Sequence, residues 1–239
     1  MSENLKTIGF IFILCSVCSL LLTAGSAGLK DFQQKNIVLD KQKNILKSVG
    51  ILNKVSSKKE IESLYNDKIK NFWVDLSGNL ILNESKDLIP LYVFLNEKEI
   101  DSYIIPFDVK GLWGKIKGYI AIDNDGTHVR GFTVYNSSET PGLGGEIEKS
   151  WFQNNFINKK IIDDSGKFVS VVVSKGKTPD GMSKNKKQNY VDGISGATLT
   201  GKFLTTGIRE TLSQYELYSS KLRANKDIKI LPQTSGKNK

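Results

Sequence analysis

The sequence KIKGYIAIDNDGTHVRGFTVY, from Lys115 to Tyr135, contains the strongest fold signal in the chain. Two β-rich runs, Lys115–Ile122 and Val129–Tyr135, flank the tetrapeptide Asp123–Gly126. Asp-Gly between two such runs is a typical turn signal, because glycine and aspartate tolerate the backbone angles of tight hairpin turns. This stretch therefore predicts an antiparallel β-hairpin.

Further strands are predicted on both sides of the hairpin, at Leu80–Leu82, Pro90–Leu95 and Phe168–Val173. A short helix is predicted over Ser57–Tyr65, with Ser56 or Ser57 as the cap and Glu60 at capping-box distance from Ser57. The last ordered element is a helix that starts near Thr198. Its apolar residues recur at helical spacing: Leu199, Phe203, Leu204, Ile208 and Leu212.

Most strands precede the last helix and do not alternate with long helices. This order favours an α+β fold with an antiparallel sheet over a doubly wound fold. With 239 residues, the chain has room for one folded domain with an anchor and a tail. We expect a transmembrane anchor at 1–29, a domain with a juxtamembrane stalk at 30–225, and a flexible tail at 226–239.

The anchor is predicted from Ile8–Ala24, which contains no charged residue. A helix of roughly 20 residues spans the hydrocarbon core of a bilayer, and uncharged residues up to Gly28 extend the run. The alternative is a cleaved signal peptide, because small residues follow at Ala24–Ala27. Lysines flank both ends, so the positive-inside rule does not decide the orientation.

Both cysteines of the chain, Cys15 and Cys18, lie inside this apolar run. A redox or metal role would require thiolates, which hydrocarbon disfavours, so we interpret them as inert membrane-facing or helix-packing residues. The net charge of +9 comes from scattered lysines without an aromatic-basic recognition motif, and it indicates solvated loops and no nucleic-acid partner.

The segment with the clearest chemistry is Tyr190–Thr200, YVDGISGATLT. Glycines and small side chains allow a sharp turn, and a helix follows at once. A helix N-terminus offers unpaired N–H groups to a phosphate, and here the hydroxyl of Thr198 stands beside them. The residues alone also permit ordinary helix capping by Ser195 or Thr198.

Two further blocks accompany this segment. Glu139–Glu148, ETPGLGGEIE, is followed by Trp151 and contains glycines that allow close backbone approach to a flat ligand, with Leu143 as an apolar contact. Taken alone, it is equally a Pro-Gly turn without a ligand. The other block is Gly111–Gly114, GLWG, which leads into the hairpin.

These blocks resemble those of the FMN-binding domain family. In that family a separate magnesium-dependent flavin transferase takes FMN from FAD and esterifies its phosphate with a threonine. Thr198 matches that threonine within Ser195–Thr198, with Asp192 ahead of it. The Gly111–Gly114 block and the Val-Asp-Gly-Ile lead-in are similar to one branch, the C subunit of sodium-translocating NADH:quinone reductases. The alternative branch is the G subunit of Rnf electron-transport complexes, which shares the other two blocks.

The resemblance implies a redox subunit that carries electrons on a covalent FMN and has no complete NADH site of its own. NADH is oxidised elsewhere in such a complex, and electrons pass toward quinone, coupled to sodium export. The implied partners are other membrane and flavin subunits, the flavin transferase and the lipid bilayer. The implied location is a bacterial inner membrane, with one span and the soluble domain on the periplasmic side.

The flavin-contacting residues are carried over from the matching blocks. Trp113 either stacks near the flavin or is a buried structural tryptophan. The expected cofactor-binding residues are Thr198, Ser195, Gly196, Ala197, Glu139, Thr140, Leu143, Gly144 and Trp113, with Thr198 as the attachment point.

Other chemistries find little support in the sequence. His128 is the only histidine and sits beside the hairpin turn, where a solvated side chain is expected in place of a general base or metal ligand. We therefore assign no catalytic residue and no metal site. A rival of another class is an anchored, non-redox binding module whose Ser195–Thr198 segment only caps a helix.

Overall fold

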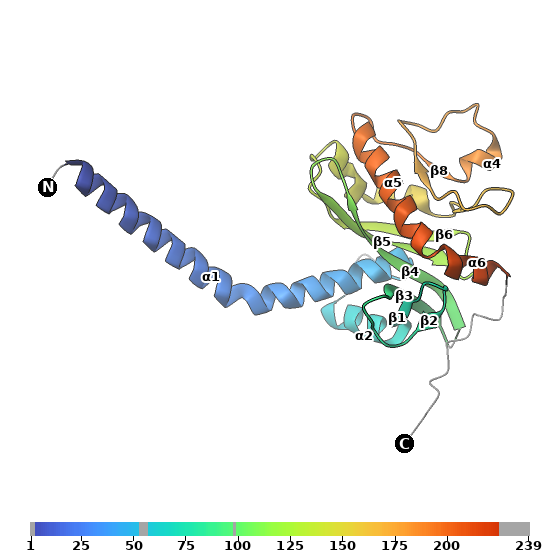
Figure 1. Ribbon diagram of the computed structural model, residues 1–239, viewed down its shortest axis with the longest axis horizontal. Helices are drawn as coiled ribbons and strands as arrows, with labels where there is room; N and C mark the ends of the chain where they lie inside the picture. Colours follow the sequence, from blue (N-terminus) through green and yellow to red (C-terminus); the bar gives the residue numbers. More distant parts are fainter. Residues whose placement is uncertain (1–2, 53–56, 98, 225–239) are drawn as a thin grey trace, which may run out of the picture. The chain divides into compact units, whose positions relative to one another are not determined.

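The computed structural model describes residues 3–52, 57–97 and 99–224 (Figure 1). The tail expected at 226–239 and the alternative cap Ser56 lie outside these residues. The chain forms two compact units, Met1–Lys41 and Gln42–Lys239.

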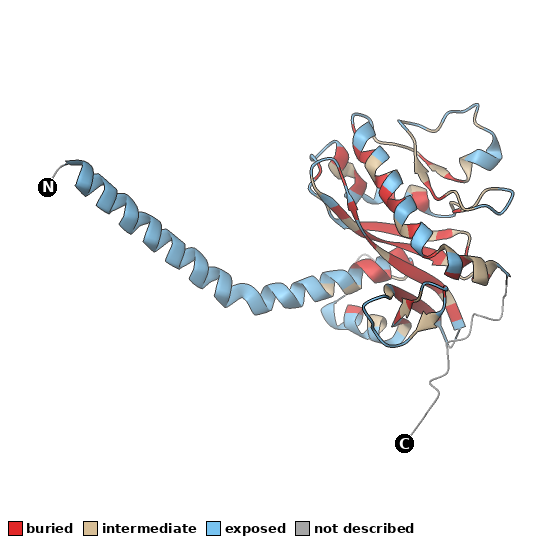
Figure 2. Ribbon diagram, in the orientation of Figure 1, coloured by how far each residue is buried: buried red, intermediate tan, exposed pale blue. Residues whose placement is uncertain are grey.

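The first unit consists of most of helix α1, which spans Glu3–Ser48. Among the described residues, α1 is the one helix with the length and apolar composition needed to cross a membrane. Apart from the half-buried Leu39, its apolar residues are exposed along residues 3–41, as are Cys15 and Cys18 (Figure 2). The juxtamembrane stalk expected after the anchor begins as a continuation of the same helix, which ends at Ser48. This segment therefore has the properties of a membrane anchor.

The second unit contains an antiparallel sheet. Its strands are β1 (Ile69–Val74), β2 (Leu80–Ile81), β3 (Ile89–Asn96), β4 (Glu99–Lys110), β5 (Lys115–Asp123) and β6 (Val129–Asn136). Within the described residues these six strands lie in the order β2-β1-β3-β4-β5-β6, and every pair is antiparallel. The α+β class and the hairpin predicted from the sequence are thus confirmed.

Two helices near the C-terminus cover one face of the sheet, namely α5 (Thr198–Gln214) and α6 (Glu216–Ala224) (Figure 1). The main core lies between them and the sheet. It includes Leu204 and Ile208 of α5 together with Ile105 and Ile120 of the central strands. Removing this apolar surface from water is the main stabilising contribution to the domain.

The other face of the sheet is covered by the last turns of α1 and by α2 (Lys58–Lys68). Ile45 and Leu46 of α1 are fully buried, and the hydroxyl of Thr133 on β6 donates to the carbonyl of Asn44. Helix α2 starts with the predicted capping box between Ser57 and Glu60. Both faces of the central strands are therefore buried.

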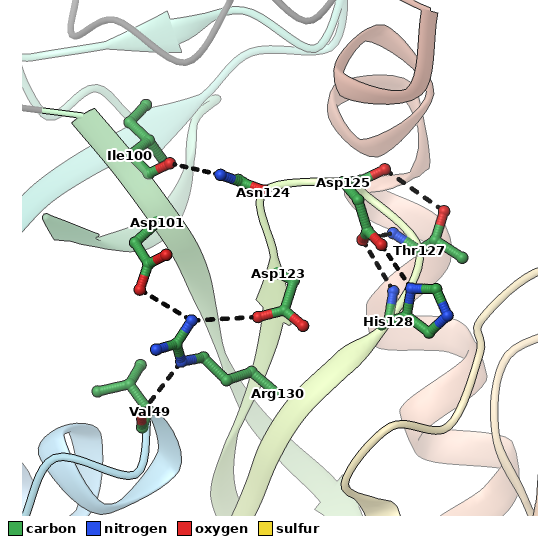
Figure 3. A network of polar contacts seen from close by, with 9 residues as sticks. All are labelled: Val49, Ile100, Asp101, Asp123, Asn124, Asp125, Thr127, His128 and Arg130. Atoms are coloured by element: carbon green, nitrogen blue, oxygen red, sulfur yellow. Dashed lines mark hydrogen bonds and ion pairs between the residues drawn. The ribbon is translucent and has the colours of Figure 1, made fainter. Parts of the chain in front are cut away.

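A polar network fastens the end of α1 to the sheet (Figure 3). The Arg130 guanidinium lies between Asp101 and Asp123, at 2.8 and 3.2 Å, and its Nε donates to the carbonyl of Val49. At the nearby turn the His128 ring contacts the Asp125 carboxylate. His128 thus lies beside the hairpin turn, as expected, and its partner belongs to that same turn.

Smaller elements connect the sheet to α5. They are η1 (Gly144–Glu148), α3 (Ser150–Gln153), η2 (Asn154–Phe156), β7 (Val172–Val173), α4 (Lys184–Lys187) and β8 (Tyr190–Val191). The strand predicted over Phe168–Val173 was wrong in extent. Only Val172 and Val173 form a strand, because Ser170 has a φ of 67° and interrupts the extended backbone.

Candidate functional site

Helix α5 begins at Thr198, where the sequence predicted it. Ala197 is the N-cap, and the hydrogen bond from Gly201 N–H to the Ala197 carbonyl opens the helical ladder. The N–H groups of Thr198, Leu199 and Thr200 precede this bond and have no acceptor within the helix. The side chain of Thr198 is exposed beside these donors, so its hydroxyl stands at a natural position for an anion.

Ordinary capping does not explain the two hydroxyl residues of this turn. The N-cap position belongs to Ala197, which has no side-chain oxygen and makes no side-chain cap bond. Thr198 is already the first helical residue, and both it and Ser195 are exposed. Within the described residues, the capping alternative therefore gains no support.

Leu143 connects the second sequence block to this turn. Gly196 has a φ of 77°, and a Cβ at that position would lie 2.8 Å from Cδ2 of Leu143. Glycine is needed here both for its left-handed backbone and for the close approach of Leu143. The blocks at 139–148 and 195–198, which the sequence proposed as parts of one site, thus lie against each other.

Glu139 joins all three blocks. Its Oε1 accepts the N–H groups of Leu112 and Trp113, at 2.8 and 3.1 Å. Its Oε2 accepts the hydroxyl of Thr200 in the first turn of α5, at 2.6 Å. Glu139 and Thr200 are 6% and 2% exposed, so this carboxylate is buried among its partners.

Two glycines leave room for this carboxylate. A Cβ on Gly111 would lie 2.5 Å from Oε1 of Glu139. A Cβ on Gly144 would lie 2.5 Å from the Thr200 hydroxyl and 2.7 Å from Oε2 of Glu139. Any other residue at either position would push the three blocks apart. Gly111 and Gly144 therefore allow close packing against Glu139.

Large apolar side chains are exposed around the start of α5. Trp113 is 70% exposed, Leu199 53% and Leu143 44%. The exposure of Trp113 excludes the alternative of a buried structural tryptophan. Trp151, which follows the second block, donates its Nε1–H to Glu146 of the same block. Exposed apolar side chains beside a helix end whose first N–H groups have no acceptor within the helix suit a ligand with a flat ring and a phosphate.

Glu139 is the site residue whose position departs most from a simple ligand-lining role. The sequence placed it in contact with the flavin, whereas the structure places both its oxygens in hydrogen bonds inside the protein. Thr200 was missed as a site residue. A signal for it existed, because Thr200, Leu204 and Ile208 share one helix face and all three are buried.

Comparison with known proteins identifies the family. The family model described as an FMN-binding domain matches residues 111–213, which contain all three blocks. The C subunit of the Na(+)-translocating NADH-quinone reductase of Yersinia pestis is 32% identical to this chain, in a match that covers 82% of this chain and 83% of that protein. Its Vibrio alginolyticus counterpart is 31% identical over 86% of this chain and 88% of its own. The chain belongs to the C subunit family of these reductases.

Solved structures agree with this membership. The crystal structure of the C subunit from Parabacteroides distasonis has a TM-score of 0.69 and 34% identity, and the match covers 80% of this chain and 97% of that one. NqrC of Shewanella oneidensis, 22% identical with a TM-score of 0.65, has the same fold. The branch to which the chain belongs is thus the reductase C subunit and not the Rnf G subunit.

In this member of the C subunit family, the turn before α5 is held by Asp192. Its Oδ1 accepts the N–H of Thr178 at 2.7 Å. Hydrogen bonds from the Thr178 backbone and side chain hold the pKa of Asp192 below its usual value near 3.8. Elsewhere in the described residues, no cluster of three or more His, Cys, Asp or Glu side chains forms a possible metal site.

Proposed function

We propose that this member of the C subunit family carries electrons on an FMN attached through its phosphate to Thr198. The observation that supports this most directly is the exposed Thr198 hydroxyl beside the first N–H groups of α5. The FMN-binding family match and the close contact of Leu143 with Gly196 add to it.

The residues present fit such a group. A phosphate ester on Thr198 would receive hydrogen bonds from the N–H groups of the first turn and would lie at the positive end of the helix dipole. The exposed side chains of Leu143, Leu199 and Trp113 would give the ring system apolar contacts. The compact Gly196–Ala197 segment leaves the hydroxyl open to a modifying enzyme.

The attachment reaction is a transfer of FMN from FAD to Thr198. The Thr198 oxygen forms a bond to the phosphorus on the FMN side, the pyrophosphate bond breaks, AMP leaves, and the hydroxyl proton is released. The flavin then supplies the electron-accepting and electron-donating chemistry. The chain contributes attachment, orientation and shielding, and it needs no NADH site of its own.

The cellular setting belongs to the same proposal. Residues 1–29 form a retained membrane anchor, residues 30–225 form the flavin domain with its stalk, and this domain lies on the periplasmic side of a bacterial inner membrane. Its partners are the other membrane and flavin subunits of the reductase, the flavin transferase and the lipid bilayer. Electrons pass toward quinone from NADH that is oxidised elsewhere in the complex, and this transfer is coupled to sodium export. A covalent bond keeps the flavin from being lost outside the cytoplasm.

The test is the mass of the Asp192–Lys202 peptide after co-expression with the flavin transferase. We expect the wild-type peptide to carry one FMN and the denatured protein to fluoresce in a gel under ultraviolet light. Thr198→Val should abolish both signals, because it removes the attacking oxygen. Thr206→Val, an exposed threonine on the same helix, is the matched control and should keep them. An unmodified wild-type peptide, or a fluorescent Thr198→Val band, would overturn the proposal, and a colourless wild type would favour a non-redox binding module.

A further inference from the structure

We propose that Glu139 is a positioning residue for flavin attachment, which acts through Thr200 and does not bind the flavin itself. This inference rests on the proposed function. It starts from the buried carboxylate that links the Gly111–Gly114 block to the first turn of α5.

The bond to Thr200 fixes the rotation of α5 about its own axis. Successive residues of an α-helix are about 100° apart, so Thr198 and Thr200 differ by roughly 200° and point to nearly opposite sides. Thr200 is 2% exposed and faces Glu139, whereas Thr198 is exposed. As long as Thr200 is held on the Glu139 carboxylate, the Thr198 hydroxyl must face outward. Glu139 thus determines where the attacking oxygen is presented.

The carboxylate cannot easily move to release Thr200. Its Oε1 is held by two consecutive backbone N–H groups, those of Leu112 and Trp113. Hydrogen bonds between a charged acceptor and backbone N–H groups are roughly twice as strong as neutral ones. Gly111 and Gly144 pack closely around the carboxylate and its partner. A Cβ added to Gly111 would lie 2.5 Å from Oε1 of Glu139, and a Cβ added to Gly144 would lie 2.5 Å from the Thr200 hydroxyl oxygen. The start of α5 is therefore anchored to a rigid point.

The Glu139 carboxylate also links the block that carries Trp113 to the helix turn that carries the Thr198 hydroxyl. Trp113 and Leu112 are fixed through their backbone by Oε1, while α5 is fixed by Oε2 of the same side chain. The backbone at Trp113 and the backbone at Thr198 are thus held at a constant spacing. A transferase that must place a flavin ring and a phosphate together would recognise this spacing.

The experiment measures modification of the full chain in detergent, purified without flavin from a host that lacks the transferase. Purified transferase and FAD are added, and the initial rate of FMN addition is followed by mass spectrometry. Thr200→Val keeps the shape of the side chain but loses the hydroxyl, so the first turn is no longer held. We expect kcat/KM to fall about tenfold, as for the loss of a hydrogen bond to a charged group. Thr200→Ser keeps the hydroxyl and should stay within about twofold of the wild type.

Two further variants separate positioning from stability and from charge. Ser219→Ala removes another buried hydroxyl, bonded to Tyr103 at 2.7 Å, and should lower the melting temperature without changing the rate. Glu139→Gln keeps the bridge with weaker, neutral hydrogen bonds, because its oxygen can still accept the two N–H groups while its amide donates to Thr200, and it should slow modification less than Thr200→Val does.

Each variant can contradict the inference. A folded Thr200→Val chain modified at the wild-type rate would overturn it, as would equal slowing in Ser219→Ala. A Glu139→Gln chain as slow as Thr200→Val would also overturn it, because charge and not the bridge would then matter. If the wild-type chain itself takes up no FMN, it is the proposed function that fails.

Discussion

Asp192, in the turn before α5, should make the stability of the folded chain depend on pH. Because its hydrogen bonds to Thr178 hold its pKa below the usual value near 3.8, its charged form stabilises the folded state. That contribution is fully present above the pKa of the unfolded chain and is lost as the pH falls through the lower, folded pKa. The wild type should therefore lose stability relative to Asp192→Asn as the pH falls from about 5 to about 3.

This prediction is checked by measuring the melting temperatures of both proteins across that range of pH. Asp180→Asn, which neutralises an exposed aspartate of the same loop region, is the control and should follow the wild type. A constant difference between wild type and Asp192→Asn at every pH would contradict the prediction. It would mean that the substitution removes hydrogen bonds of Asp192, but that the Asp192 carboxylate makes no pH-dependent contribution to stability.

At the scale of elements, Gln153 connects the end of α1 to the loop that contacts the start of α5. Its side-chain N–H₂ donates to the carbonyls of Val134 on β6 and Ile147 in η1, at 3.1 and 3.2 Å. Its Oε1 accepts from Nζ of Lys47 in the last turn of α1, at 3.0 Å. Gln153 is 2% exposed, so the two carbonyls have little access to water if it is removed.

We predict that Gln153→Leu lowers the free energy of unfolding by about 1–3 kcal/mol, because it leaves buried carbonyls without a donor. Lys47→Met should cost less than about 1 kcal/mol, because Lys47 is largely exposed and keeps its apolar stem as methionine. Both values come from denaturant unfolding of the full chain in detergent, followed by tryptophan fluorescence. Equal costs for the two variants would contradict this ranking and would place the main effect in the lysine contact.

Elements with local signals were predicted from the sequence, and elements without them were not. The β5–β6 hairpin has its Asp-Gly turn, α2 its capping box and α5 its apolar stripe. β4, the longest strand in the described residues, was missed. Both of its faces are buried from Ser102 to Ile105, so its sequence does not alternate there, and Pro106 within it argues against a strand.

The candidate site likewise has parts that the sequence predicts and parts that it does not. Thr198 and the Leu143–Gly196 contact follow from blocks that the sequence marks, and the structure brings those blocks together. The role of Glu139 does not follow from them, because its partners Leu112 and Thr200 are 27 and 61 residues away along the chain. A single sequence carries no sign of which distant hydroxyl a carboxylate will meet. Only the spacing of Thr200 from Leu204 and Ile208, four and eight residues further on, indicated that it shares a helix face with core residues.

At the scale of the whole molecule, the two units differ in how they are stabilised. The first unit exposes apolar side chains along a single helix and has no core of its own among the residues described. The second unit has a core on each face of its sheet.

The boundary between the two units, at Gln42, predicts where the chain can be truncated. A chain of residues 42–239 keeps Ile45, Leu46 and Val49, which are buried on the second face of the sheet, and it keeps the Val49 carbonyl that Arg130 binds. A chain of residues 51–239 loses all of these. Since burying each such side chain contributes about 1.5–3 kcal/mol, we expect the shorter chain to be less stable by about 5 kcal/mol or not to fold.

Both fragments are made without detergent and compared with the full chain by fractionation and by denaturant unfolding. The 42–239 fragment should leave the membrane fraction and unfold in a single cooperative transition, because its apolar helix surface has been removed while both cores remain. Should it stay with the membranes, the domain itself would bind lipid and α1 would not be the sole anchor. Should the 51–239 fragment prove equally stable, the last turns of α1 would not be part of the domain core, and their burial against β6 would be incidental to folding.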